Sequence, residues 1–96
     1  MHGIDPDSLD RLFSAVLALK SKEECAAFFD DLCTITEMKD MAQRLDTAFM
    51  LDKGLNYQSI SGIVGTSTAT ISRVSRCLNY GSGGYRTVID RLNGKE

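Results

Sequence analysis

Two arginines and a group of small hydroxyl-bearing residues lie close together in the C-terminal half of the chain. They fall in a predicted helix that begins at Ser67 and ends near Asn79. Guanidinium groups pair bidentately with guanine or phosphate, and hydroxyl groups bond to bases or phosphates. If the apolar residues of this helix face inward, the outward face carries Ser67, Thr68, Ala69, Ser72, Arg73 and Arg76. These residue types predict a surface that reads the major groove of DNA.

The segment from Tyr57 to Arg76 has the residue types that a helix-turn-helix requires at fixed positions. Gly65 can adopt positive φ in the turn, and Ser61, four positions earlier, is small enough for the helix crossing. The apolar residues at the offsets that lock the two helices together are Ile60, Val64, Ile71 and Val74. The first helix begins near Gln58 and Ser59, where free backbone N–H groups suit a phosphate.

The distribution of charge favours the same assignment. The formal net charge is −2, but residues 1–40 carry four basic and nine acidic groups, whereas residues 41–96 carry seven basic and four acidic groups. No acidic residue occurs from Leu55 to Tyr85. A solvated polar face on an ordinary helix is the alternative interpretation, but such a face normally mixes both signs of charge.

The rest of the chain has helical periodicity only. Apolar residues at helical spacing predict helices from Pro6, from Ser21 with a capping box, and from Thr34 to Gly54. The apolar face of the first helix consists of Leu9, Leu12, Phe13, Val16 and Leu17, and that of the second of Cys25, Phe28, Phe29, Leu32 and Cys33. In the third helix the expected buried stripe consists of Met38, Met41, Ala42, Leu45, Ala48 and Phe49. The phenylalanines of these faces are expected in the core or at a dimer interface. We therefore expect an all-α fold of about six helices in one domain, residues 1–96. It is divided into dimerisation helices (1–55), the helix-turn-helix (56–80) and a C-terminal helix (85–93).

Other kinds of site find little support. His2 is the sole histidine, so no catalytic set of nucleophile, base and orienting acid can be assembled, and we expect no enzyme activity. Cys25, Cys33 and Cys77 lack the spacing of metal ligands and are expected to be buried free thiols, with no metal and no cofactor. Without a membrane-spanning run or a signal peptide, the protein is expected to be cytoplasmic.

Two blocks of sequence resemble the tryptophan-repressor family of bacterial regulators. The block ATISRVSRCLNYG, preceded by AQRLDTAFMLDKG, is closest to the YerC/YecD branch, and the resemblance covers roughly residues 9 to 92. It implies an intertwined homodimer whose N-terminal helices interlock and from which two helix-turn-helix heads protrude. It also implies a transcriptional regulator that binds operator DNA.

The same resemblance implies a possible effector pocket. Arg44 and Arg73 match the two arginines that sandwich the indole ring of tryptophan, and Thr34 and Thr70 match two pocket threonines. Val74 departs from the pattern, because the repressor has glycine there, and Cys77 replaces a serine. The Val74 side chain would occupy space that the ring needs, and overpacking costs about 1–3 kcal/mol. We therefore expect that tryptophan does not bind.

The leading hypothesis is a sequence-specific, repressor-like regulator that binds double-stranded DNA as a homodimer. The alternative is a helical protein-interaction module that has lost DNA binding, with the acidic first half docking a partner. The operator, the regulated genes and any small-molecule effector are not indicated by the sequence.

Overall fold

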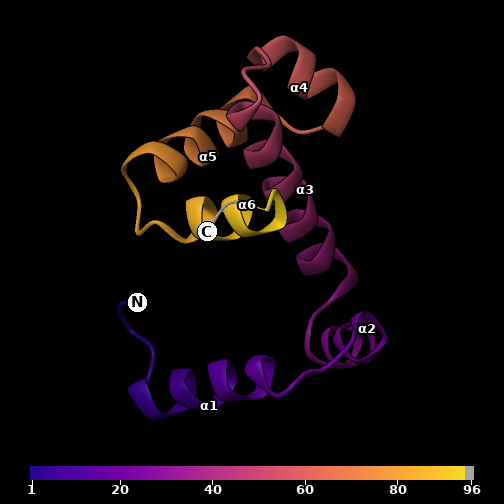
Figure 1. Ribbon diagram of the computed structural model, residues 1–96, viewed down its shortest axis with the longest axis vertical. Helices are drawn as coiled ribbons and strands as arrows, with labels where there is room; N and C mark the ends of the chain where they lie inside the picture. The colour runs from indigo at the N-terminus through magenta and orange to yellow at the C-terminus, as the bar shows by residue number, and fades with distance from the viewer. Residues whose placement is uncertain (95–96) are drawn as a thin grey trace. The chain divides into compact units, whose positions relative to one another are not determined.

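Six helices and no strand occur in residues 1–94, which the computed structural model describes (Figure 1). Residues 95–96, the end of the predicted domain, lie outside this part. The helices are α1 (Pro6–Leu17), α2 (Lys22–Leu32), α3 (Ile35–Asp52), α4 (Tyr57–Val64), α5 (Thr68–Tyr80) and α6 (Gly84–Leu92). The prediction of an all-α fold is therefore confirmed.

Polar side chains cap the starts of four of these helices, and those at Ser21 and Ser67 are at predicted positions. The side chains of Asp5, Ser21, Asn56 and Ser67 accept hydrogen bonds from the backbone N–H three residues later. Each bond satisfies one of the N–H groups that a helix start leaves without an internal partner. The last helix differs by one residue at each end from the predicted range 85–93. It follows Gly83, whose φ is 86° and which supplies no side-chain cap.

The chain forms two units, Met1–Ile35 and the part from Thr36 onward. The second unit has a core of its own. Ala48 of α3, Val74 of α5 and Ile89 of α6 are buried together, and Leu78 and Tyr85 pack against them. The structure thus groups α3 with the helix-turn-helix, whereas the predicted subdivision placed it with the first two helices.

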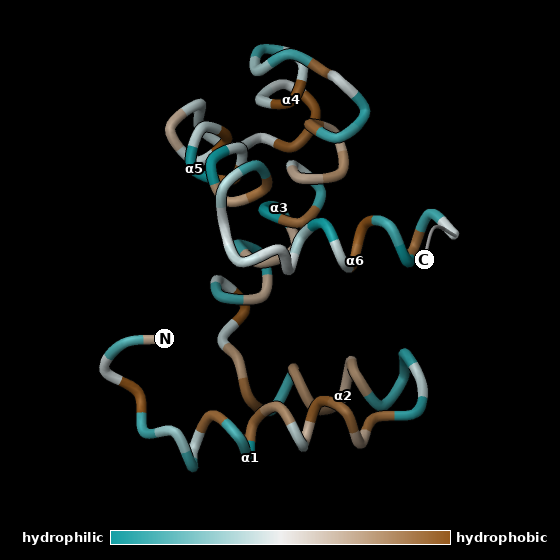
Figure 2. Tube along the Cα trace, turned by 60° about the vertical axis from the view of Figure 1, so that its left-hand side comes forward, coloured by the Kyte–Doolittle hydropathy of each residue, from teal (hydrophilic) through white to brown (hydrophobic). Residues whose placement is uncertain are grey.

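The first unit contains no buried residue in either of its helices. Phe13 is 47% exposed, Leu17 85% and Leu32 51%, although these positions form the apolar faces predicted from the periodicity. Figure 2 marks the hydrophobic positions along α1 and α2 in brown. Two short helices cannot enclose their own apolar surface. The two predicted helices are confirmed, and burial of their apolar faces at a dimer interface stays a prediction.

Some apolar residues in the first half of α3 share this exposure. Met38 and Met41 are 37% and 38% exposed, and Ala42 is also exposed. The predicted buried stripe is confirmed at Ala48 but is wrong for these three residues in the single chain, because the core of the second unit begins only at Thr47 and Ala48.

The three cysteines are free thiols in different surroundings. Cys25 and Cys33 are half-buried, but Cys77 is exposed, so the expectation of burial is wrong for Cys77. It lines an open apolar groove beside the core that Val74 enters. In residues 1–94, no helix combines the length and the apolar character needed to cross a membrane.

Candidate nucleic-acid interface

The turn between α4 and α5 has the geometry predicted for a helix-turn-helix. Gly65 ends α4 with φ 80° and ψ 22°, a left-handed conformation that glycine adopts at little cost. The hydroxyl of Ser61 donates a hydrogen bond of 2.8 Å to the carbonyl of Thr66 and so spans the turn. Ser61 therefore does more than leave room for the helix crossing, because it also holds the turn closed.

Apolar residues on the inner faces determine which side of α5 points outward. Ile60 of α4 and Ile71 of α5 are completely buried, and Val74 is 1% exposed. Positions three and four apart share one face of a helix, so burial of Ile71 and Val74 turns the polar positions between them outward. The predicted inward positions of these three residues are confirmed.

All eight residues predicted to contact DNA are exposed. They lie at the start of α4, at the N-cap of α5 and along its outward face: Gln58, Ser59, Ser67, Thr68, Ala69, Ser72, Arg73 and Arg76. The structure brings them together on the two helices of one motif. Whether they contact DNA stays a prediction.

The two arginines of this surface differ from Arg86 on α6. Arg86 pairs with Asp52 at 2.8 Å and with Asp90 at 3.2 Å, and its hydrogen bonds to these carboxylates raise the pKa of its guanidinium. Arg73 and Arg76 have no carboxylate within salt-bridge distance among residues 1–94. Their charges are therefore available to an external anion.

The hydroxyl groups of the interface are not equally available. The Ser67 hydroxyl accepts a hydrogen bond from the backbone N–H of Thr70 and donates one to the Thr70 hydroxyl. The cap uses an acceptor lone pair of Ser67, whereas its one proton is directed to the Thr70 hydroxyl. The hydroxyls of Thr68 and Ser72 make no hydrogen bond in the described part of the chain. The predicted cap at Ser67 is confirmed, and it does not exclude the predicted contact with DNA.

Two residues of the predicted effector pocket lie together in the structure. Arg44 of α3 and Thr70 of α5 line a small polar pocket of about 150 Å³. Asp40, Gln43 and Thr66, which the sequence did not indicate, complete its lining. Asp40, Gln43 and Arg44 stand at i, i+3 and i+4, a helical spacing that could have revealed their common face.

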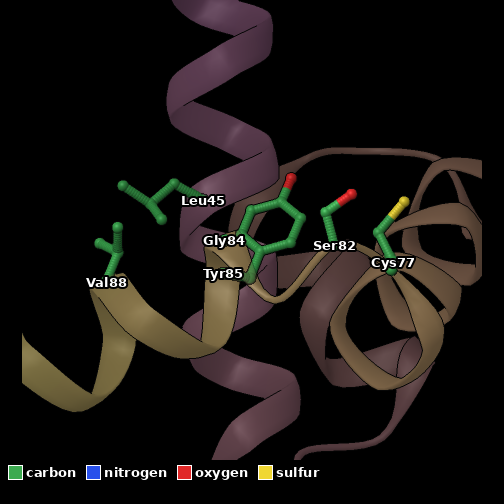
Figure 3. A pocket seen from close by; sticks show the side chains of 7 residues that line it. Leu45, Cys77, Ser82, Gly84, Tyr85 and Val88 are labelled. Atoms are coloured by element: carbon green, nitrogen blue, oxygen red, sulfur yellow. The ribbon is translucent and has the colours of Figure 1, made fainter. Parts of the chain in front are cut away.

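The other predicted pocket residues lie elsewhere. Val74 is part of the core, whereas Cys77 lines a separate apolar groove of about 540 Å³ with Leu45 and Tyr85. Figure 3 shows the side chains of this groove, which come from α3, the end of α5 and the segment that begins α6. Arg73 is exposed and lines neither cavity. Thr34 belongs to the first unit, so its place in such a pocket stays a prediction.

Comparison with known proteins places these features in a family. Residues 7–93 match the family described as Trp repressor protein. The uncharacterized protein YerC of Bacillus subtilis (strain 168) is 54% identical over 88 residues, which cover 92% of this chain and 85% of that protein.

Solved structures agree in both fold and sequence. A crystal structure of a candidate Trp repressor from Staphylococcus aureus matches with a TM-score of 0.89 and 47% identity, over 93% of this chain and 89% of the other. A TrpR-like protein from Eubacterium eligens ATCC 27750 matches with a TM-score of 0.90 and 44% identity, over 96% and 95% of the two chains. The chain, a YerC-like protein with a tryptophan-repressor-like fold, belongs to the Trp repressor family.

Proposed function

We propose that the protein is a transcriptional regulator that binds operator DNA through its helix-turn-helix. The observation that carries this proposal is the exposed face of α5. Its arginines make no ion pair within residues 1–94, and its hydroxyl groups and small residues lie in a stretch without acidic residues. A surface of this composition matches phosphates and base edges together.

In this proposal, α5 lies in the major groove with its N-terminal end nearest the bases. Thr68 and Ala69 are small, so the helix backbone can approach the base edges, and their methyl groups can contact thymine methyls. Arg73 and Arg76 pair with guanine or phosphate. Gln58 and Ser59 approach a phosphate at the start of α4, where the helix dipole favours negative charge.

We further propose that two copies form the homodimer implied by the family. Several apolar residues of α1 and α2, among them Phe13, Leu17 and Leu32, are exposed in the single chain, and burial against a second copy would remove them from water. Two helix-turn-helix motifs related by a two-fold axis would bind half-sites separated by about 34 Å, one helical turn of DNA. A cytoplasmic location follows from this function.

We propose that tryptophan is not the effector. Val74 is 1% exposed and packs with Ala48 and Ile89, so its side chain belongs to the core. An indole ring placed over this position would have to displace a packed isopropyl group. Isothermal calorimetry with free tryptophan should therefore show no binding, and a micromolar dissociation constant would contradict the assignment of Val74.

The DNA-binding proposal is tested by paired arginine variants. Duplexes that the wild-type protein enriches from a random library provide the target, and fluorescence anisotropy measures affinity. Replacing both Arg73 and Arg76 with alanine should weaken target binding by at least about tenfold, because each bidentate base contact contributes roughly 1–3 kcal/mol. Arg91→Ala is the matched control, since Arg91 is an exposed arginine of α6 outside the interface. Equal affinity of the double variant and the wild type would reject the proposal.

A protein-interaction role remains the second candidate. It is favoured by the first unit, whose exposed apolar residues Phe13, Leu17 and Leu32 accompany the acidic excess of residues 1–40. Capture of partners with and without nuclease distinguishes the two functions. A protein partner retained equally after nuclease treatment, together with no enrichment of any duplex, would favour the second candidate.

A further inference from the structure

A side-chain hydrogen bond connects α3 to the turn of the helix-turn-helix. The Nε2 of Gln43 donates to the carbonyl oxygen of Val64 at 3.3 Å, across 21 positions of sequence. The bond is partly buried, and Gln43 itself is half-buried. The donor therefore comes from a helix outside the motif, and the acceptor belongs to the last residue of α4.

The accepting carbonyl is at a position that matters for the motif. The last carbonyls of a helix lack partners within that helix and need another donor. At the end of α4, the backbone N–H of Gly65 bonds to the carbonyl of Ser61, and the Val64 carbonyl is left to Gln43. Val64 directly precedes Gly65, the residue whose conformation turns the chain toward α5. Gln43 thus contacts the end of α4, immediately before the turn that leads into α5.

This contact adds to the apolar packing between α3 and the motif, where Val74 and Leu78 of α5 lie in one cluster with Ala48 of α3. Gln43 and Ala48 are five residues apart, which corresponds to about 7 Å along the axis of α3. Apolar packing is not directional, whereas a hydrogen bond is. The bond of Gln43 therefore adds a directional constraint at a second position along α3.

The surroundings of Gln43 offer little apolar packing that could replace the bond. The small pocket beside it is lined by the polar residues Asp40, Arg44, Thr66 and Thr70 as well as Gln43. The hydrogen bond within the motif, from Ser61 to Thr66, fixes α4 relative to α5 but not relative to α3.

We propose that Gln43 is a positioning residue, which sets the orientation of the DNA-contacting helix on α3 through the carbonyl of Val64. The inference rests on the proposed DNA-binding function. It assigns the orientation of α5 to a contact that the chain makes with itself, without a bound small molecule. Gln43 does not touch DNA in this account, so its loss leaves the charges of the interface unchanged.

The experiment compares Gln43→Met with the wild-type protein. Methionine has similar length but no donor. Affinity is measured for the selected target duplex and for a scrambled duplex of the same length and composition. Base contacts require the correct orientation of α5, whereas attraction to phosphates depends mainly on charge. We expect target affinity to fall roughly tenfold, as the loss of one hydrogen bond in each of two subunits would give, with little change for the scrambled duplex.

The matched control is Asn79→Leu. Asn79 also donates an amide hydrogen bond to a backbone carbonyl, that of Ser75, but both residues lie within α5. This variant should keep the ratio of target to scrambled affinity. Circular dichroism at the assay temperature checks that both variants are fully folded, because unfolding would lower both affinities together.

The outcomes distinguish a failure of the DNA-binding proposal from a failure of the positioning role of Gln43. If the wild-type protein prefers no duplex over its scrambled counterpart, the DNA-binding proposal fails. If the wild type discriminates and folded Gln43→Met discriminates equally well, the positioning role of Gln43 is wrong while DNA binding stands. Equal losses for the target and scrambled duplexes would also overturn the positioning role.

Discussion

Both units of the chain contain helices with an apolar face, but only the second unit buries residues of that face in a core. From Thr36 onward, α3, α5 and α6 bury Ala48, Val74 and Ile89 against one another. Before that point, α1 and α2 have comparable periodicity, yet neither helix contains a buried residue. Periodicity therefore determines which face is apolar, but the number of neighbouring elements determines whether that face is buried. The difference predicts a second unit that is stabilised internally and a first unit that depends on a partner.

The largest effect is expected in the core of the second unit. Ile89→Ala should lower the free energy of unfolding by about 2–5 kcal/mol, because it removes a completely buried side chain and leaves a cavity. Chemical denaturation measures this change. Leu92→Ala on the same helix is the control, since Leu92 is 69% exposed, and it should change the unfolding free energy by less than about 0.5 kcal/mol if no partner covers it. Equal effects of the two variants would show that this core does not carry the stability of the unit.

Substitutions in the first unit should change self-association. Phe13→Ala should weaken self-association by about 1–3 kcal/mol, the range for burying one large apolar side chain. Sedimentation or light scattering over a dilution series measures the dissociation constant, with Ser14→Ala as the exposed neighbour for comparison. A wild-type protein that stays monomeric and fully folded at high concentration would contradict the dependence of this unit on a second copy.

A smaller and more local effect is expected in the helix-turn-helix, where two glycines make a matched pair. A Cβ atom would meet no other atom within 4 Å at either Gly62 or Gly65, so space does not distinguish them. Gly65 has φ 80°, however, and alanine there should cost about 1–2 kcal/mol. Gly62 lies within α4 without positive φ, and Gly62→Ala should stabilise by up to about 1 kcal/mol. Thermal or denaturant unfolding measures both changes. If Gly65→Ala and Gly62→Ala change the free energy of unfolding in the same direction, the left-handed conformation of Gly65 does not determine the cost of its substitution.

The features that the sequence predicted well depend on neighbours in the chain. The caps at Ser21, Asn56 and Ser67 and the turn at Gly65 each involve residues within a few positions of one another. Helix ends and the outward face of α5 could be predicted for this reason.

The features that it predicted poorly depend on distant segments. The exposure of Phe13 and Cys77 depends on which helices are nearby. The contact of Gln43 with Val64 joins positions 21 apart, and no local pattern indicates it. The place of Asp40 and Thr66 in the small polar pocket is of the same kind, since it depends on how α3 meets the turn.

The central claim, that the exposed face of the helix-turn-helix binds DNA, is tested most directly by amide chemical-shift mapping. Isotope-labelled protein is titrated with a duplex that the wild type enriches from a random library. We predict the largest shift changes at Gln58 and Ser59 and across residues 67–76, with the first unit little affected. Changes confined to residues 1–35, or none at saturating duplex, would contradict the account.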